Sequence, residues 1–165
     1  MSKKTFAVDI SKQQLTFSCA HFITFAGNIC EALHGHNYGV SCRVEGQLDV
    51  NQYVIDFIAL RDQLAEISKH LDHHVILPTK HPSISVQHDA TAKEVVTRFE
   101  DKRWIFPEDD CILLPVANTT AEEIASYFVD HLCDKLGKHI SPLIKSLTVR
   151  IDENQGQWGE CRLDF

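Results

Sequence analysis

The sequence predicts a single α+β domain in which antiparallel strands pack against two helices. Apolar residues alternate with polar ones near both ends of the chain, which is typical of half-buried strands. In two stretches between these ends they recur every three to four residues, which is typical of amphipathic helices. The 165 residues are enough to bury one core, and neither a repeat nor a linker divides them. We therefore expect one domain over residues 1–165, with the order β-β-α-arm-α-β-β.

Four strands are expected, two at each end of the chain. Alternation predicts the first over residues 5–18, with a turn near Ser11–Lys12, and the second over residues 36–46. It predicts a third strand over residues 147–153 and a last one over residues 157–165. These strands should form antiparallel pairs.

Two helices are expected between the strand pairs. Asp56 is the predicted N-cap of the first, whose apolar positions run from Phe57 to Leu71 at three- and four-residue steps. Thr120 begins a capping box that opens the second helix, and Gly137 is expected to end it.

The segment between the helices, at about residues 75–118, has no helical period. Its residues 83–87 and 103–106 are predicted to pair as a β-hairpin-like arm inserted into the domain. The sequence does not say what this arm contacts.

Composition narrows the range of functions. The net charge of −7 argues against a broad nucleic-acid interface, which would need clustered Lys and Arg. No stretch approaches the roughly 18 apolar residues of a membrane helix. The N-terminal residues lack the apolar run of a signal peptide, so a cytoplasmic protein is expected. The six cysteines include no C-x-x-C pair and are expected to be free thiols.

Three histidines form a candidate metal site. His34 and His36 are two residues apart in a predicted strand, so both side chains point to the same face. His21 follows the end of the preceding strand and would complete the set if the two strands pair. Three imidazoles that leave one coordination position open are typical of catalytic zinc. The alternative is a pair of surface histidines in a loop.

Five ordered motifs resemble the 6-pyruvoyltetrahydropterin and 6-carboxytetrahydropterin synthase family, and together they span nearly the whole chain. They are Phe17-Ser18-Cys19-Ala20-His21, Cys30-x-x-x-His34-Gly35-His36-Asn37-Tyr38, Leu71-Asp72-His73-His74, Thr119-Thr120-Ala121-Glu122 and Val149-Arg150-Ile151-Asp152-Glu153.

The resemblance implies a tunnelling fold, which is a four-stranded antiparallel sheet with two helices on one face. It also implies a homo-hexamer made of two stacked trimers, with active sites between subunits. The residues that match the family's Zn²⁺ ligands are His21, His34 and His36. The implied substrate is 7,8-dihydroneopterin triphosphate, and the implied reaction is a carbon–oxygen lyase reaction that forms 6-carboxy- or 6-pyruvoyltetrahydropterin.

The resemblance also assigns catalytic roles. Cys30 has the spacing of the base in the carboxytetrahydropterin-forming branch, because it lies four residues before His34. A thiol near a metal can be a thiolate at neutral pH, whereas a buried structural cysteine is the alternative. Asp72 and His73 match the family's proton relay, in which the carboxylate fixes the imidazole that moves protons.

Two further residues match substrate-binding positions. Glu153 ends an apolar alternation and matches the family's pterin anchor, where a carboxylate accepts two hydrogen bonds from the amidine-like edge of the ring. If the alternation were shifted by one residue, Asp152 would take the place of Glu153. Thr120 matches a threonine near the pterin, although its capping role alone explains its residue type.

Glu31 departs from the pattern of the cysteine-dependent branch. In a variant branch of the family, a glutamate three residues before the H-G-H motif replaces the cysteine. Enzymes of that branch cleave the substrate's side chain to give 6-hydroxymethyl-7,8-dihydropterin for folate synthesis. Both Cys30 and Glu31 are present here, which resembles members linked to both the deazaguanine and the folate pathways. For Glu31, the alternative is a solvent-facing residue without a catalytic role. For the whole protein, the alternative to an enzyme is a zinc- or pterin-binding module without turnover.

The remaining histidines have no motif support and are expected to be surface or structural residues. They are His70, His74, His81, His88, His131 and His139.

Overall fold

The structure is a computed structural model, and it describes residues 4–26, 29–137, 141–154 and 156–165. Its helices and strands in chain order are β1 (Phe6–His21), β2 (Thr24–Phe25), β3 (Ile29–Cys30), β4 (His34–Gly46), α1 (Phe57–Leu71), β5 (His74–Pro78), β6 (Ser85–Asp89), β7 (Glu94–Phe99), β8 (Lys102–Pro107), a 3-10 turn (Glu108–Asp110), β9 (Cys111–Leu114), α2 (Ala121–Leu136), β10 (Ile144–Asn154) and β11 (Gln157–Asp164). The predicted α+β class is confirmed.

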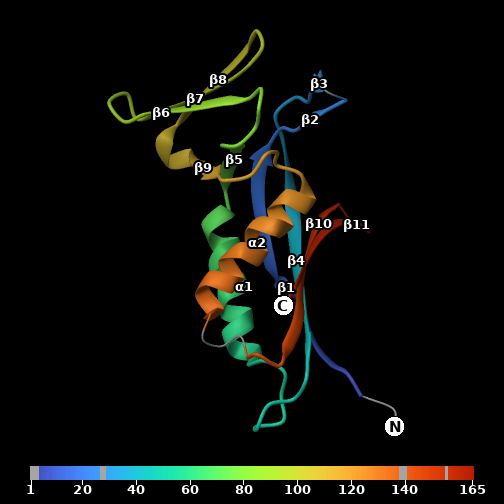
Figure 1. The fold of residues 1–165 in the computed structure, drawn as a ribbon. Coiled ribbons are helices and arrows are strands. Elements are labelled where there is room, and N and C mark those ends of the chain that lie inside the picture. The colour runs from blue at the N-terminus through green and yellow to red at the C-terminus, as the bar shows by residue number, and fades with distance from the viewer. Residues whose placement is uncertain (1–3, 27–28, 138–140, 155) are drawn as a thin grey trace.

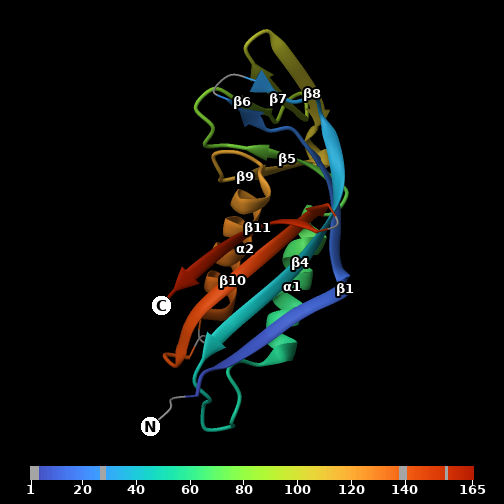
Figure 2. The ribbon, with the colours of Figure 1, turned by 90° about the vertical axis from the view of Figure 1, so that its right-hand side faces the viewer.

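The main sheet has the strand order β11-β10-β4-β1-β5-β9, and both helices lie on the same face of it (Figure 2). The four strands from β11 to β1 are the four predicted from alternation, and they pair antiparallel. The predicted total of four is wrong, because β5 and β9 add in parallel to the edge of β1. Their short apolar runs resemble loop sequence, and they become strands because a sheet edge leaves backbone groups that need partners.

The first strand is longer than predicted and does not turn back. Its pairing with β4 shifts between Ser11 and Thr16, where residues 12–15 lie opposite the single residue Val40. The predicted turn near Ser11–Lys12 is therefore a bulge within one strand, and the strand continues to His21. The continuation matters because it carries His21 into pairing with β4.

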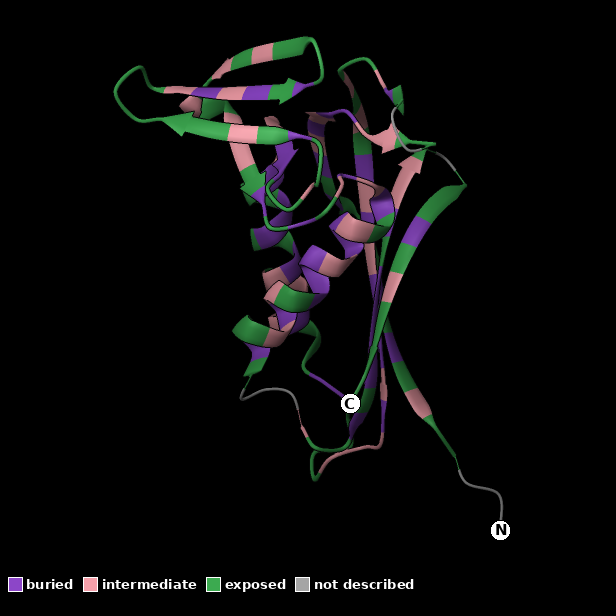
Figure 3. Cartoon of the chain, turned by 45° about the horizontal axis from the view of Figure 1, so that its top comes forward, coloured by how far each residue is buried: buried purple, intermediate pink, exposed green. Residues whose placement is uncertain are grey.

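Both helices begin where their capping residues predict. Asp56 accepts a hydrogen bond from the backbone N–H of Ile58 at 2.7 Å, and the Thr120 hydroxyl accepts one from Glu123 at 3.4 Å. The apolar stripes of both helices face the sheet, and buried residues line this interface (Figure 3). Neither helix has the length and apolar composition needed to cross a bilayer.

The inserted segment forms a second sheet of three strands in the order β6-β7-β8. The predicted direct pairing of residues 83–87 with residues 103–106 is wrong, because β7 lies between these two strands and pairs with both. This sheet, hereafter the arm, lies at the same end of the molecule as β2 and β3 (Figure 1). It covers a second hydrophobic cluster of Phe22, Cys30, Leu77, Ile84, Val95 and Phe99.

Candidate metal and substrate site

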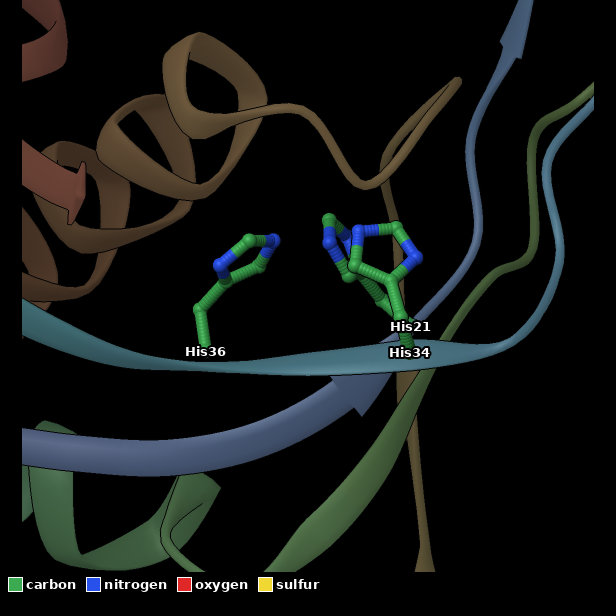
Figure 4. A group of neighbouring side chains, drawn as sticks. All are labelled: His21, His34 and His36. Carbon is green, nitrogen blue, oxygen red and sulfur yellow. The ribbon is translucent and has the colours of Figure 1, made fainter.

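The three predicted metal ligands converge at the end of β1 and the start of β4. His21 pairs directly with His34 across the two strands, and Cys19 pairs with His36, so all three imidazoles share one face of the sheet. Their rings lie on the same side of β4 (Figure 4). One nitrogen from each ring lies within 4.8 Å of the other two.

Gly35 allows this close approach of the two strands. A Cβ atom at this position would lie 3.0 Å from the carbonyl oxygen of Cys19. A larger residue between His34 and His36 would push β1 away from β4, so sterics explain why the middle residue of the H-G-H motif is glycine.

Backbone carbonyls set the tautomers of two of the rings. His21 Nδ1–H donates to the carbonyl of Thr119 at 2.8 Å, and His34 Nδ1–H donates to the carbonyl of Ala32 at 2.9 Å. Each bond leaves the Nε2 lone pair free for a metal, an arrangement common around metal-bound histidines. Burial lowers the pKa of His21, which keeps its ring neutral as a ligand must be. The donor set therefore fits a divalent metal, and imidazole nitrogens suit zinc.

Tyr38 and Glu153 complete the polar surroundings of the histidines. The buried Tyr38 hydroxyl lies 3.1 Å from His21 Nε2 and donates to Glu153 Oε1 at 3.3 Å. The same Glu153 oxygen is 3.5 Å from Nε2 of His21 and of His36. Sequence reasoning assigned no role to Tyr38, although its position two residues after His36 places it on the same strand face.

Glu153 also borders a pocket of about 230 Å³ between β10, β11 and the start of α2, and Thr120 is a second lining residue. The pocket is further lined by Ile23, Ala121, Glu122, Gln157, Trp158 and Gly159. The two predicted substrate-binding residues thus meet in one cavity beside the histidines. Asp152, the alternative to Glu153, lines a different pocket.

Cys30 and Glu31 occupy different surroundings although they are neighbours. The Cys30 side chain is buried in the cluster beneath the arm, and this burial raises the pKa of its thiol despite the nearby Lys102 cation. The Glu31 carboxylate lies 3.9 Å from His34 Nε2 and is partly exposed. Of the two candidate bases, Glu31 is the one directed at the histidine cluster.

The predicted relay pair forms, and His73 lines a pocket of about 550 Å³ together with His36. Asp72 Oδ2 is 2.8 Å from His73 Nδ1, and its other oxygen accepts the Ser18 N–H at 2.7 Å, a hydrogen bond that lowers the pKa of Asp72. The His73 side chain is 82% exposed. Among the described residues, it has no hydrogen bond or ion pair with the histidine cluster, Cys30 or Glu31.

The histidines without motif support lie elsewhere. His88 pairs with Glu108 on the arm at 2.6 Å, His81 contacts the Thr24 hydroxyl at 2.7 Å, and His131 contacts Tyr127 on α2. His74 donates to the Asp72 carbonyl, and His70 is exposed on α1. His139 lies outside the described residues.

The fold and the site define an α+β enzyme whose candidate centre is a three-histidine cluster beside a carboxylate-lined pocket. A sequence model described as 6-pyruvoyl tetrahydropterin synthase matches residues 9–164. The chain therefore belongs to the 6-pyruvoyl tetrahydropterin synthase family, and it is an enzyme of the lyase type that this family defines.

Curated relatives include two archaeal proteins provisionally named 6-carboxy-5,6,7,8-tetrahydropterin synthase. The protein from Methanocaldococcus jannaschii is 36% identical over 148 residues, which cover 89% of this chain and 88% of the relative. The protein from Pyrococcus horikoshii is 30% identical over 149 residues, which cover 87% of this chain and 83% of the relative.

Solved structures of 6-pyruvoyltetrahydropterin synthase from Plasmodium vivax share the whole fold. One superimposes with a TM-score of 0.90 at 30% identity and covers 99% of this chain and 100% of its own. Another, with a TM-score of 0.88 and the same identity and coverage, is a variant in which a glutamate described as a catalytic residue is replaced by alanine.

Proposed function

We propose that the protein is a zinc-dependent lyase that acts on 7,8-dihydroneopterin triphosphate and cleaves its side chain to give 6-hydroxymethyl-7,8-dihydropterin, with Glu31 as the base. The observation that carries the choice of reaction is the opposite placement of two adjacent residues. Glu31 lies 3.9 Å from a histidine of the cluster, whereas Cys30 is buried beneath the arm.

His21, His34 and His36 would hold the zinc ion through their Nε2 atoms. The carbonyls of Thr119 and Ala32 support this role because they occupy the Nδ1–H groups of two rings. Bound zinc would act as a Lewis acid toward the oxygens of the substrate side chain and make neighbouring protons more acidic.

Glu31 would perform the proton transfer that starts cleavage. Breaking the side-chain carbon–carbon bond requires a base that removes a hydroxyl proton beside that bond and an acid that returns a proton to the carbon left on the ring. A carboxylate next to the metal ligands has the reach for the first task. The Plasmodium vivax protein, in which a glutamate is described as a catalytic residue, is consistent with this role.

Glu153 would anchor the pterin. Its carboxylate lines the pocket beside the histidines, where it can accept two hydrogen bonds from the ring's amidine-like edge. Thr120 lines the same pocket and would contact the ring. The Tyr38 hydroxyl donates to Glu153 and would hold the carboxylate in place.

Asp72 and His73 would complete the site from a neighbouring subunit. The exposure of His73 and the lack of a hydrogen bond or ion pair between this pair and the described histidine cluster support the homo-hexamer that the family resemblance implies, with active sites between subunits. In this arrangement His73 supplies the proton that the cleaved carbon takes up.

A second candidate reaction is formation of 6-carboxytetrahydropterin with Cys30 as the base. It is favoured by the presence of the cysteine at the spacing of that branch and by the names of the archaeal relatives. It requires the Cys30 side chain to leave its buried position.

Product analysis distinguishes the two reactions. The protein is incubated with 7,8-dihydroneopterin triphosphate, with and without a chelator, and the pterins are identified by mass spectrometry. We expect 6-hydroxymethyl-7,8-dihydropterin from the wild type and from Cys30→Ala, and a loss of at least about 100-fold in Glu31→Gln with the metal retained. If 6-carboxytetrahydropterin is the sole product and depends on Cys30 alone, the second candidate is correct. Undiminished turnover in a metal-free sample contradicts the role of zinc.

A further inference from the structure

One lysine ties the arm to the connection between β1 and β4, hereafter the loop, which carries Cys30 and Glu31. The Lys102 ammonium group donates to the backbone carbonyl oxygen of Cys30 at 2.8 Å, although the two residues are 72 positions apart. Lys102 begins β8, directly after the two-residue turn that follows Phe99. A charge-assisted hydrogen bond of this kind is stronger than one between neutral groups, so it restrains the loop backbone.

The register of the arm explains why Lys102 points at the loop. It pairs with Phe99, and two residues further along β8 Trp104 pairs with Thr97. Directly paired residues share a sheet face, and both Phe99 and Thr97 are buried. Lys102 therefore lies on the inner face of the arm, whereas the next residue, Arg103, pairs with the exposed Arg98 on the outer face. Lys102 and Arg103 are both exposed at this end of the arm, and what distinguishes Lys102 is its hydrogen bond to Cys30.

The arm holds this loop at its other end as well. The Trp104 ring stacks on Phe22 with 4.4 Å between ring centroids, and Phe22 directly follows the metal ligand His21. Within the loop, the Glu31 N–H donates to the carbonyl of Ile23 at 3.0 Å. The segment between the metal ligand and Glu31 is thus clamped on both sides by side chains of β8.

The hydrogen bond to the Cys30 carbonyl affects which of two neighbouring side chains, Cys30 or Glu31, faces the histidine cluster. Cys30 ends β3, and its carbonyl belongs to the peptide group that links it to Glu31, so holding this carbonyl restrains the backbone from which both side chains project. In the observed orientation the thiol lies in the cluster beneath the arm and the Glu31 carboxylate lies 3.9 Å from His34 Nε2.

We propose that Lys102 is a positioning residue that keeps the Glu31 carboxylate directed at the His34 ring. This inference rests on the proposed role of Glu31 as the base. It gives the arm a function in the reaction, because the arm supplies the lysine.

The test compares Lys102→Met with the matched variant Arg103→Met, which removes a positive charge from the outer face of the same strand. Lys102→Arg is the conservative variant, because it keeps a charged donor. Two quantities are measured on the zinc-loaded protein, namely amide hydrogen exchange by mass spectrometry and the steady-state constants with 7,8-dihydroneopterin triphosphate.

We expect Lys102→Met to speed exchange in the peptides that cover residues 22–34 and to leave exchange in α1 and α2 unchanged. Its kcat should fall by about tenfold or more, because small misplacements of a reacting group are costly, while KM stays within about twofold. Arg103→Met should match the wild type, and Lys102→Arg should recover most of kcat.

Four results overturn the proposal, of which three concern the loop and the kinetics. These three are unchanged loop exchange in Lys102→Met, faster exchange without a loss of kcat, and an equal loss in Arg103→Met. Faster exchange throughout the chain also overturns it, since Lys102 would then be needed for folding alone. If the wild type does not turn over the substrate, the proposed function is wrong, and the exchange measurement by itself decides whether Lys102 holds the loop.

Discussion

At the scale of single residues, the histidine cluster depends on which ring nitrogen each histidine offers. His21 and His34 both donate from Nδ1 to carbonyls of loop residues, so Nε2 is the unprotonated nitrogen that each ring offers to a metal. The spacing of His34 and His36 predicted that both would share a face, and pairing of β1 with β4 brings in His21. The carbonyl partners could not be predicted, because Thr119 is 98 positions away from His21.

Removing one ligand should abolish tight metal binding. We expect His34→Ala to lower zinc affinity by at least about 100-fold, since losing even a supporting partner of a metal ligand costs about 10- to 100-fold. Competition with a chromophoric chelator measures the affinity. His88→Ala is the control, because His88 pairs with Glu108 on the arm and should leave binding unchanged. Equal affinity in wild type and His34→Ala would show that the metal binds elsewhere.

The buried Cys42 thiol should make stability depend on alkaline pH. Burial raises the pKa of Cys42 to about 12 from its ordinary value of 9.0, so the native state favours the protonated form. Its contribution is complete below pH 9 and is lost as the pH rises from there toward 12. Between pH 8 and 10.5, the free energy of unfolding measured with urea should fall by about 2 kcal/mol more in the wild type than in Cys42→Ala, in which the buried Cys19 thiol still contributes. The same decrease in both proteins would assign it to other groups.

At the scale of elements, most boundaries follow from local signals, and the exceptions have long-range causes. Capping residues predicted the starts of both helices, and alternation predicted four strands of the main sheet. The added strands β5 and β9 were missed because they exist only where the edge of β1 offers partners. The middle strand of the arm was missed because its short alternation does not differ locally from that of a polar loop.

Thr120 has two candidate roles that substitution separates. Thr120→Ala should lower the free energy of unfolding by about 1 kcal/mol, because the N-terminus of α2 loses its cap, and Thr120→Ser should restore it. Thermal unfolding measures the change. If the threonine also contacts the pterin through its methyl group, Thr120→Ser should keep the stability and raise KM. An unchanged KM in Thr120→Ser limits the residue to capping.

At the scale of the whole molecule, the described part of one chain does not bring all the predicted site residues into direct contact. Among the described residues, the relay pair Asp72–His73 makes no hydrogen bond or ion pair with the histidine cluster, and its imidazole is exposed to solvent. Large apolar side chains are also exposed at the C-terminal edge strand, among them Trp158 and Leu163. Both observations fit an assembly in which subunits share active sites.

Mixed assemblies test this arrangement. Subunits carrying His73→Ala and subunits carrying Glu31→Gln should each be inactive alone. Coexpressed in equal amounts, they should recover about a quarter of wild-type activity, because a site that draws the two residues from different subunits is intact in about one of four random pairings. Light scattering should give about 112 kDa for six copies of the 18.7 kDa chain. No recovery in a confirmed hexamer would place both residues of each site on one chain.

The sequence by itself determined the α+β class, the two capped helices, the four antiparallel strands and the three histidines, because each follows from periodicity or spacing along a short segment. Tertiary structure decided the six-stranded sheet, the three-stranded arm and the different surroundings of Cys30 and Glu31. These depend on contacts between distant segments, such as the hydrogen bond from Lys102 to the Cys30 carbonyl. Sequence reasoning could name two adjacent candidate bases, but only the tertiary structure shows that Glu31 lies near His34 while Cys30 is buried beneath the arm.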